Sequence, residues 1–281
     1  MPTTPSASVS AQPLSRGLRL WLITDTVIVF IAGVQLFVLA DYTSSFFAWT
    51  IKPSLTATFL GGSYWASLPL VYLSSRQTIW ARARLAVFGV LIFSILTFAA
   101  TLLHIDRFHL SSADPTAWIA AWVWLIIYLI FSPALLALLF FQMRLPGHEP
   151  LRQASLPFWL RLVLAAQAAV MLGLGVILFV APTTPLWPWT LTPLTGRAVA
   201  AWLVGIGVMA AQSIWENDWQ RIGAGLLSFL LFGGLQALAL IRYSGAIGWN
   251  APPIILYLCI LVSMLLVGGY GWRKARQASI A

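Results

Sequence analysis

Charged residues are scarce in this chain. Only 8% of its 281 residues are Asp, Glu, Lys or Arg, whereas 60% are hydrophobic. A soluble domain carries roughly 25% charged residues, so the chain has too little polar surface to cover a soluble globule. Several apolar stretches approach the roughly 20 residues that a membrane-spanning helix needs. The composition therefore predicts an all-α integral membrane protein whose principal partner is the lipid bilayer.

Cysteine and histidine are also rare. The single cysteine, Cys259, cannot form an internal disulfide and lies in an apolar run, as a small packing residue does. The chain has three histidines, and His148 falls in a hydrophilic segment. A haem held by two histidines inside the bilayer is therefore disfavoured. Signatures of kinases, hydrolases, P-loop proteins and zincins are missing, so the sequence leans away from an enzyme.

Basic residues are abundant relative to acidic ones, with a net charge of +9. They lie in short connections between apolar runs, which argues against a nucleic-acid partner and for membrane topology. Alternating β-barrel patterning is missing, so the runs are helices. Eight spans are predicted, at 20–40, 57–75, 85–104, 117–141, 158–180, 198–215, 222–241 and 253–272.

These spans place twelve Lys and Arg residues on one side of the membrane and four on the other. The side rich in positive charge faces the cytoplasm, so both termini are predicted to be cytoplasmic. An odd number of spans would distribute the basic residues over both sides of the membrane. Glu216 and Asp218 fall on a turn of the same side and are expected to be solvated, with a bound cation or a partner contact as the alternative.

Two loops share a pattern. FFAWTIKPSLT at 46–56 matches LWPWTLTPLT at 186–195, and Trp80-x-Arg82 matches Trp219-x-Arg221 at nearly the same spacing. The shared loop residues are Trp49, Thr50 and Pro53 in the first copy and Trp189, Thr190 and Pro193 in the second.

The match predicts two parallel four-helix repeats, 20–141 and 158–272, related by an axis along the membrane normal. A cytoplasmic linker, 142–157, joins them. Residues 1–19 are predicted to be a disordered cytoplasmic tail and residues 273–281 a second cytoplasmic tail.

The repeated loops have two interpretations. Each proline favours a sharp start of the next helix, and Trp49 and Trp189 would anchor at the headgroup zone. Alternatively, the two loops frame a binding surface to which Lys52 and Arg197 add positive charge. The first interpretation is sufficient to explain the pattern.

The densest polar cluster is His104-Ile-Asp106-Arg107-Phe-His109, at the outer end of the third span. Imidazole and carboxylate groups could hold a cofactor or relay a proton. The two histidines are five residues apart, which on a helix turns them away from each other and disfavours a shared metal. A helix end in the headgroup zone is the simpler interpretation.

Within the spans, Asp25 is the clearest ionisable residue, little more than one turn into the first span. An intramembrane carboxylate is a functional candidate, although an ion pair with Arg19, Arg82 or Arg84 at the rim is the alternative. The deeper amides either bond neighbouring helices or line a substrate path; they are Gln35, Gln167, Gln212 and Gln236.

The paired loops, the run TLLHIDRFH and the run LTPLTGRAVAAWLVGIG resemble those of uncharacterised bacterial multi-spanning membrane proteins. This resemblance implies a bacterial inner membrane and no particular activity. The sequence favours a non-enzymatic accessory or scaffold protein that binds other membrane proteins. One alternative is a small-molecule or lipid transporter working between the repeats. The other is a redox or enzyme subunit with an outer-face site formed by His104, Asp106, Arg107 and His109.

Overall fold

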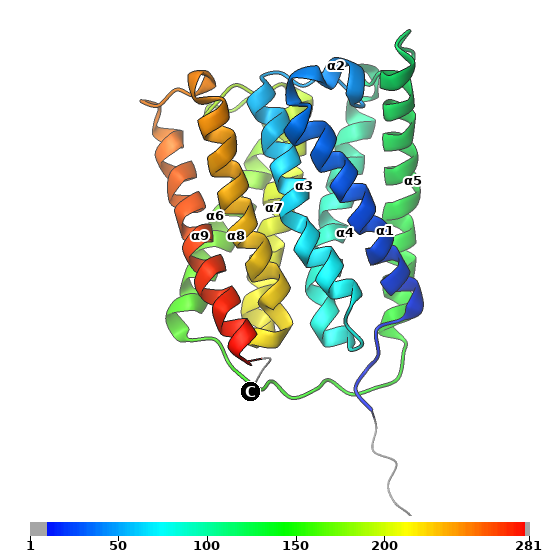
Figure 1. The fold of residues 1–281 in the computed structure, drawn as a ribbon, viewed down its shortest axis with the longest axis vertical. Coiled ribbons are helices and arrows are strands. Elements are labelled where there is room, and N and C mark those ends of the chain that lie inside the picture. Colours follow the sequence, from blue (N-terminus) through cyan, green and yellow to red (C-terminus); the bar gives the residue numbers. More distant parts are fainter. Residues whose placement is uncertain (1–9, 279–281) are drawn as a thin grey trace, which may run out of the picture.

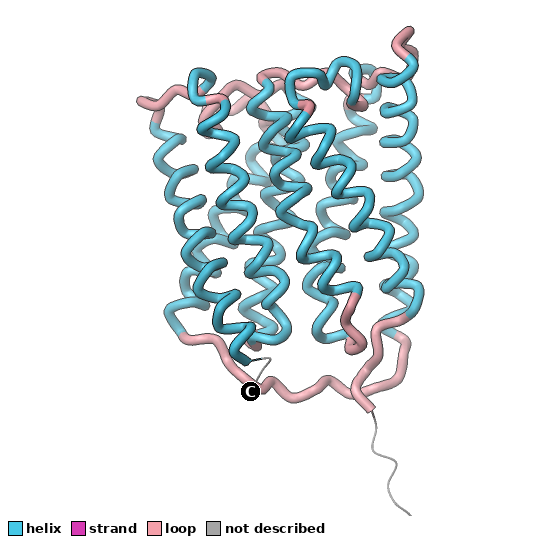
Figure 2. Tube along the Cα trace, viewed as in Figure 1, coloured by secondary structure: helices cyan, strands magenta, loops and turns pink. Residues whose placement is uncertain are grey.

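The computed structural model describes residues 10–278, which form an upright bundle of long helices with no β-strand in that range (Figures 1 and 2). One end of the bundle carries residues 142–157 and is called the linker end. The other carries residues 46–56 and 186–195 and is called the Trp-loop end. The α-helices are α1 (Arg16–Gly33), α2 (Thr43–Phe46), α3 (Ser54–Ser75), α4 (Trp80–Leu103), α5 (Pro115–Met143), α6 (Phe158–Val180), α7 (Pro193–Glu216), α8 (Trp219–Arg242) and α9 (Pro252–Ala278).

Seven of these helices are long and apolar enough to cross a membrane. They are α1, which continues through a π-helical turn to Val38, and the six helices from α4 to α9. The expectation of an all-helical, multi-pass membrane protein is confirmed at this level. The other long helix, α3, packs against α1, α4, α7 and α8 in the middle of the bundle. Because α3 faces protein and not lipid, it tolerates Ser, Thr and Gly along its length.

Most helices begin earlier than the hydrophobic runs indicated. Helices α4 and α7 begin five residues before the predicted spans, at Trp80 and Pro193. The Asp218 carboxylate caps α8, and Thr192 with Thr195 forms a capping box on α7. Capping groups bond the free N–H groups of the first turn, so a helix extends beyond its apolar segment.

Ordered backbone replaces part of both expected tails. Residues 10–15 are extended, Leu14 is buried, and Arg16 begins α1. The Leu14 N–H donates to Thr78 O at 2.8 Å, which ties this segment to the loop before α4. Helix α9 continues to Ala278. The remainder of the predicted tails, 1–9 and 279–281, lies outside the described residues.

Helices from the two halves of the chain share the core. Helix α3 packs on α8, and α4 packs on α7, whereas α5 is peripheral. Gly61 permits one close approach: a Cβ at that position would lie 2.3 Å from the Phe37 backbone nitrogen. The bundle interior is thus built across the boundary between halves, which is where a ligand site would be expected.

Candidate functional site

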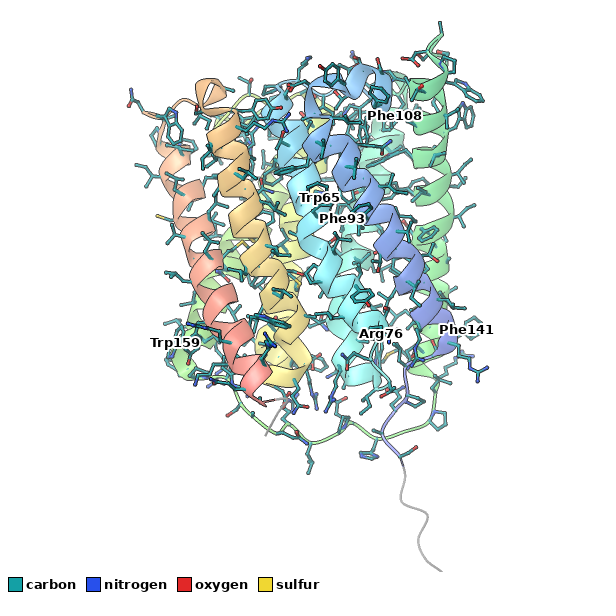
Figure 3. The ribbon with its side chains drawn as sticks, in the orientation of Figure 1. Trp65, Arg76, Phe93, Phe108, Phe141 and Trp159 are labelled. Atoms are coloured by element: carbon teal, nitrogen blue, oxygen red, sulfur yellow. The ribbon has the colours of Figure 1, made fainter. Side chains whose placement is uncertain are left out.

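A cavity of about 80 Å³, here called the central cavity, lies inside the bundle. Phe93, which lines it, is at mid-height between Phe108 near the Trp-loop end and Arg76 near the linker end (Figure 3). Six helices, four from the first half and two from the second, contribute side chains. These include Asp25 of α1, Tyr64 of α3, Phe93 of α4, Tyr128 of α5, Trp202 of α7 and Ser228 of α8.

Asp25 supplies the one carboxyl group among the described residues of this lining. It is 7% exposed, and its Oδ2 has no hydrogen-bond partner. Because α1 begins at Arg16, Asp25 lies nine residues into the helix, ~14 Å along its axis. This is deeper than the sequence indicated, since the apolar run begins after Arg19. The arginines expected to pair with it donate elsewhere: Arg19 to Gln77 O, Arg82 to Gln220 Oε1, and Arg84 to Glu149 and Glu216.

Two tyrosines also contribute polar groups to the cavity. Their hydroxyl oxygens, on Tyr64 and Tyr128, are 2.8 Å apart and buried. The Trp21 indole N–H and the Ser228 hydroxyl also line the cavity and lack partners. Sequence reasoning missed both tyrosines. A tyrosine hydroxyl in the middle of an apolar run, far from the headgroup zone, was the signal that could have identified them.

A groove of about 240 Å³ adjoins the cavity between α1 and α5. Tyr64 and Tyr128, together with Ile28 and Ile127, line both spaces. Gln35 also lines the groove, where its side-chain N–H donates to Phe46 O at 2.9 Å. In Figure 1, α1 diverges from α5 toward the Trp-loop end, as expected for a groove at residues 28–35 of α1.

At the linker end, four charged side chains form what we call the linker-end charge cluster: Arg84, Glu149, Glu216 and Arg221. Arg84 donates to both oxygens of Glu216, at 2.5 and 2.8 Å, and to both oxygens of Glu149, at 2.8 and 2.7 Å. Arg221 bonds the same two carboxylates. The cluster therefore joins α4, the linker and the α7–α8 turn.

Burial differs within this cluster. The Glu216 side chain is fully buried and those of Arg84 and Arg221 nearly so, whereas Glu149 is 47% exposed. Burial raises the pKa of Glu149, but hydrogen bonds and charges from Arg84 and Arg221 outweigh it and leave that pKa below its usual value. Glu216 and Asp218 are not solvated as expected. Asp218 is also buried and accepts from the N–H groups of Gln153 and Gln220.

The histidine cluster at the Trp-loop end does not converge. The His104 ring lies 2.7 Å from Arg197 Nη1, while the His109 ring contacts Thr50 Oγ1 and Phe47 O, both at 3.0 Å. Burial, and then the charge of Arg197, lowers the pKa of His104. Asp106 and Arg107 pair with each other at 3.0 Å and are mostly exposed. These side chains do not form one site.

The repeated loops fold inward. Trp49 and Trp189 are 3% and 6% exposed, so the expected anchoring of their rings among headgroups is wrong. The Trp189 indole N–H donates to Thr56 Oγ1 in the other half at 2.9 Å. Thr50 contacts His109, and Pro193 begins α7. Pro53 immediately precedes α3, whereas Thr190 lies three residues before Pro193. Arg197 donates to Pro193 O at 3.4 Å and contacts His104.

Two of the remaining amides bond neighbouring helices, whereas Gln212 donates to Glu216 Oε1 of its own helix at 3.5 Å. Gln236 is fully buried and donates to Phe59 O and Ser63 Oγ, at 2.9 and 3.2 Å, which joins α8 to α3. Gln167 donates to Ser263 Oγ at 2.5 Å, which joins α6 to α9. These contacts fit packing between helices better than a substrate path.

Comparison with known proteins gives no relative for this chain: no family model, no curated protein and no solved structure matches it. The functional argument therefore rests on the central cavity and its surroundings.

Proposed function

We propose that this chain is an eight-span protein of the bacterial cytoplasmic membrane that binds and transports a small molecule at a site between two four-helix repeats. The observation that carries this proposal is the central cavity, where the carboxylate of Asp25 is buried without a partner. Intramembrane carboxylates facing a cavity are characteristic of substrate and ion paths. In this proposal α3 is the eighth span, since its 22 residues are long enough to cross the bilayer.

Matched local structure supports the repeat. Helices α4 and α8 each contain 24 residues and begin at Trp80 and Trp219. The Trp80 N–H donates to Gln12 O at 3.0 Å, and the Trp219 N–H donates to Ala154 O at 3.1 Å. Each bond ties the start of the third long helix of a half to the segment before its first helix. In the proposed repeat, α3 corresponds to α7 and α4 corresponds to α8. A two-fold axis then requires that α3 pack on α8 in the same way as α7 packs on α4, and both contacts are present.

Asp25 and Gln167 occupy equivalent positions in the two proposed repeats. They are 142 residues apart, the same spacing as Gln12 and Ala154, and both are buried. The Gln167 amide bonds α9, whereas the Asp25 carboxylate lines the cavity. At equivalent positions of the proposed repeat, the second half therefore has a helix-packing contact made by Gln167, and the first half has the cavity residue Asp25.

Charge distribution supports the orientation. Arg84, Arg152 and Arg221 lie at the linker end, together with the larger share of the basic residues. Because basic segments are retained on the cytoplasmic side, both termini and the linker are assigned to the cytoplasm.

The accessory or scaffold role favoured by the sequence now takes second place, because it rested on the scarcity of intramembrane charge and on short loops. The exposed apolar faces, such as that of α5, are satisfied by lipid as well as by a partner helix. Neither lipid nor a docked helix explains a carboxylate left unpaired in the middle of the bundle.

Site-directed thiol labelling tests the proposal. Cys259 is the only cysteine, so Cys259→Ser provides a background for Ser67→Cys, which lines the cavity. The matched control is Ser213→Cys. Both serines are buried and bond a backbone carbonyl of their own helix, but Ser213 does not line the cavity. A small thiol reagent should modify the cavity cysteine much faster in proteoliposomes. Equal slow reaction at both positions would mean a closed interior and would overturn the proposal.

A further inference from the structure

We infer that the ligand of the central cavity is an organic cation with apolar substituents, either a protonated amine or a quaternary ammonium, with Asp25 as its counter-ion. The inference rests on the transport site proposed above and names its substrate class. Three features of the cavity support it: the unpaired carboxylate, the aromatic lining and the groove toward lipid.

The carboxyl group of Asp25 has an oxygen without a partner in the protein. A buried ionised carboxylate is costly unless a cation or several hydrogen-bond donors compensate it. Asp25 Oδ2 has no such partner, and the cavity lining contains no Lys, Arg or His among the described residues. A bound cation would supply the missing charge, and the indole N–H of Trp21 remains free to bond the ligand or the carboxylate.

Aromatic rings form much of the remaining wall. Phe93 and Trp202 lie with ring centroids 4.1 Å apart, and Tyr64 packs edge-on against Trp202 at 4.9 Å. Phe131, Phe229 and Phe232 also line the cavity. The face of an aromatic ring attracts ammonium groups, and aromatic side chains commonly line sites for quaternary ammonium ligands. Water could also bond the carboxylate, but it would not interact favourably with the aromatic side chains that line the cavity, as an organic cation would.

The adjoining groove provides a route from lipid. It lies between α1 and α5, where Ile31 and Val123 are about half exposed on the outside of the bundle. The hydroxyl pair of Tyr64 and Tyr128 lies where the groove meets the cavity. An amphiphilic cation dissolved in the bilayer could enter sideways with its apolar body in the groove and its charge toward Asp25.

A charged and an uncharged probe of the same shape test the inference. Benzyltrimethylammonium and neopentylbenzene differ only by a quaternary nitrogen in place of a carbon. Binding is measured on the full chain in nanodiscs of zwitterionic lipid, from quenching of tryptophan fluorescence. The proteins are wild type, Asp25→Asn and Ser228→Leu. The last variant fills the cavity, and it breaks no bond because the Ser228 hydroxyl lacks a partner.

The wild type should bind the cation more tightly than the neutral probe. Asp25→Asn should weaken cation binding by about 10–100-fold, as loss of a charge–charge attraction at a poorly solvated site predicts. The neutral probe should bind wild type and Asp25→Asn equally, which also shows that the variant is folded. Ser228→Leu should weaken binding of both probes.

Two outcomes contradict different parts of the reasoning. If both probes bind wild type equally well, or if Asp25→Asn leaves cation affinity unchanged, the cation inference is wrong while the ligand site stands. If neither probe binds wild type, or if Ser228→Leu binds both as wild type does, the central cavity is not a ligand site and the proposed function fails with it.

Discussion

Replacing Glu216 by glutamine should strongly destabilise the bundle. The Glu216 carboxylate is fully buried and accepts from Arg84 and Arg221, whose side chains are 6% and 3% exposed. With Glu149, the linker-end charge cluster contains two positive and two negative groups. Glu216→Gln preserves the shape but leaves one buried positive charge without compensation, and its amide N–H₂ points further donors at the guanidinium groups.

Removing one partner of a buried ion pair costs about 3–5 kcal/mol. For a chain of this size, such a loss lowers Tm by roughly 6–20 °C. Thermal unfolding of the purified protein in detergent, followed by circular dichroism, measures this shift. Glu149→Gln is the matched control, because its carboxylate bonds the same arginines but is 47% exposed. Water replaces much of what that variant loses, so its cost should stay at or below about 1 kcal/mol.

A double variant separates the lost charge from the lost packing. In Arg84→Met/Glu216→Gln, Arg221 and Glu149 remain and the cluster is neutral again, so the double variant should cost less than the sum of the two single variants. If Glu216→Gln unfolds at the wild-type temperature, or no earlier than Glu149→Gln, the cluster does not hold the two halves together.

The same cluster predicts an acid-sensitive stability. Although burial raises it, hydrogen bonds and charges from Arg84 and Arg221 hold the pKa of Glu149 in the folded protein below its ordinary value of 4.5. Its contribution is therefore complete above about pH 4.5 and is lost as the pH falls through the folded-state pKa. Thermal unfolding measured across this acid range should show the loss, and Glu149→Gln should reduce it. An equal acid response in both proteins would assign the loss to other groups.

Two further substitutions have matched controls nearby. Trp189→Phe removes the bond to Thr56 and should cost about 1 kcal/mol more than Trp187→Phe, whose indole N–H has no partner; equal unfolding temperatures would contradict this. Gly268→Ala places a Cβ 2.4 Å from a backbone nitrogen of α8 and should cost about 1–3 kcal/mol, whereas Gly269→Ala has room and should be neutral or stabilising; the same thermal assay ranks them.

Hydropathy located the long helices because each apolar run must satisfy its own backbone in lipid. The span 158–180 agrees with α6 at both ends, since prolines and polar residues bound that run. Agreement is poorer where arginines enter a helix: α4 includes Arg82 and Arg84, which the run at 85–104 left out. A hydropathy pattern records where lipid contact ends, and the helix continues for as long as caps and ion pairs support it.

Sequence reasoning was least reliable about the direction in which side chains point. It identified Asp25 as a candidate but placed Trp49 and Trp189 among lipid headgroups, whereas both rings are buried. The Trp189 hydrogen-bond partner, Thr56, is 133 residues away in the chain, so no local pattern could reveal it. Tyr64 and Tyr128 meet for the same kind of reason, across helices α3 and α5, and only the packed bundle brings them to one cavity.

The two groups of buried charge in this molecule differ in what they contribute. At the linker end the buried carboxylates of Glu216 and Asp218 have partners, whereas Asp25 in the central cavity has an oxygen without one. An unpartnered buried carboxyl oxygen is expected to lower the stability of the folded protein. Asp25→Asn should therefore increase the free energy of unfolding by roughly 1 kcal/mol. Its Tm should rise in the same thermal assay in which the Tm of Glu216→Gln falls. A site kept at a cost to stability is expected where a ligand provides the missing interaction. If Asp25→Asn is instead less stable than wild type, the carboxylate is satisfied within the fold, and its burial no longer argues for a ligand.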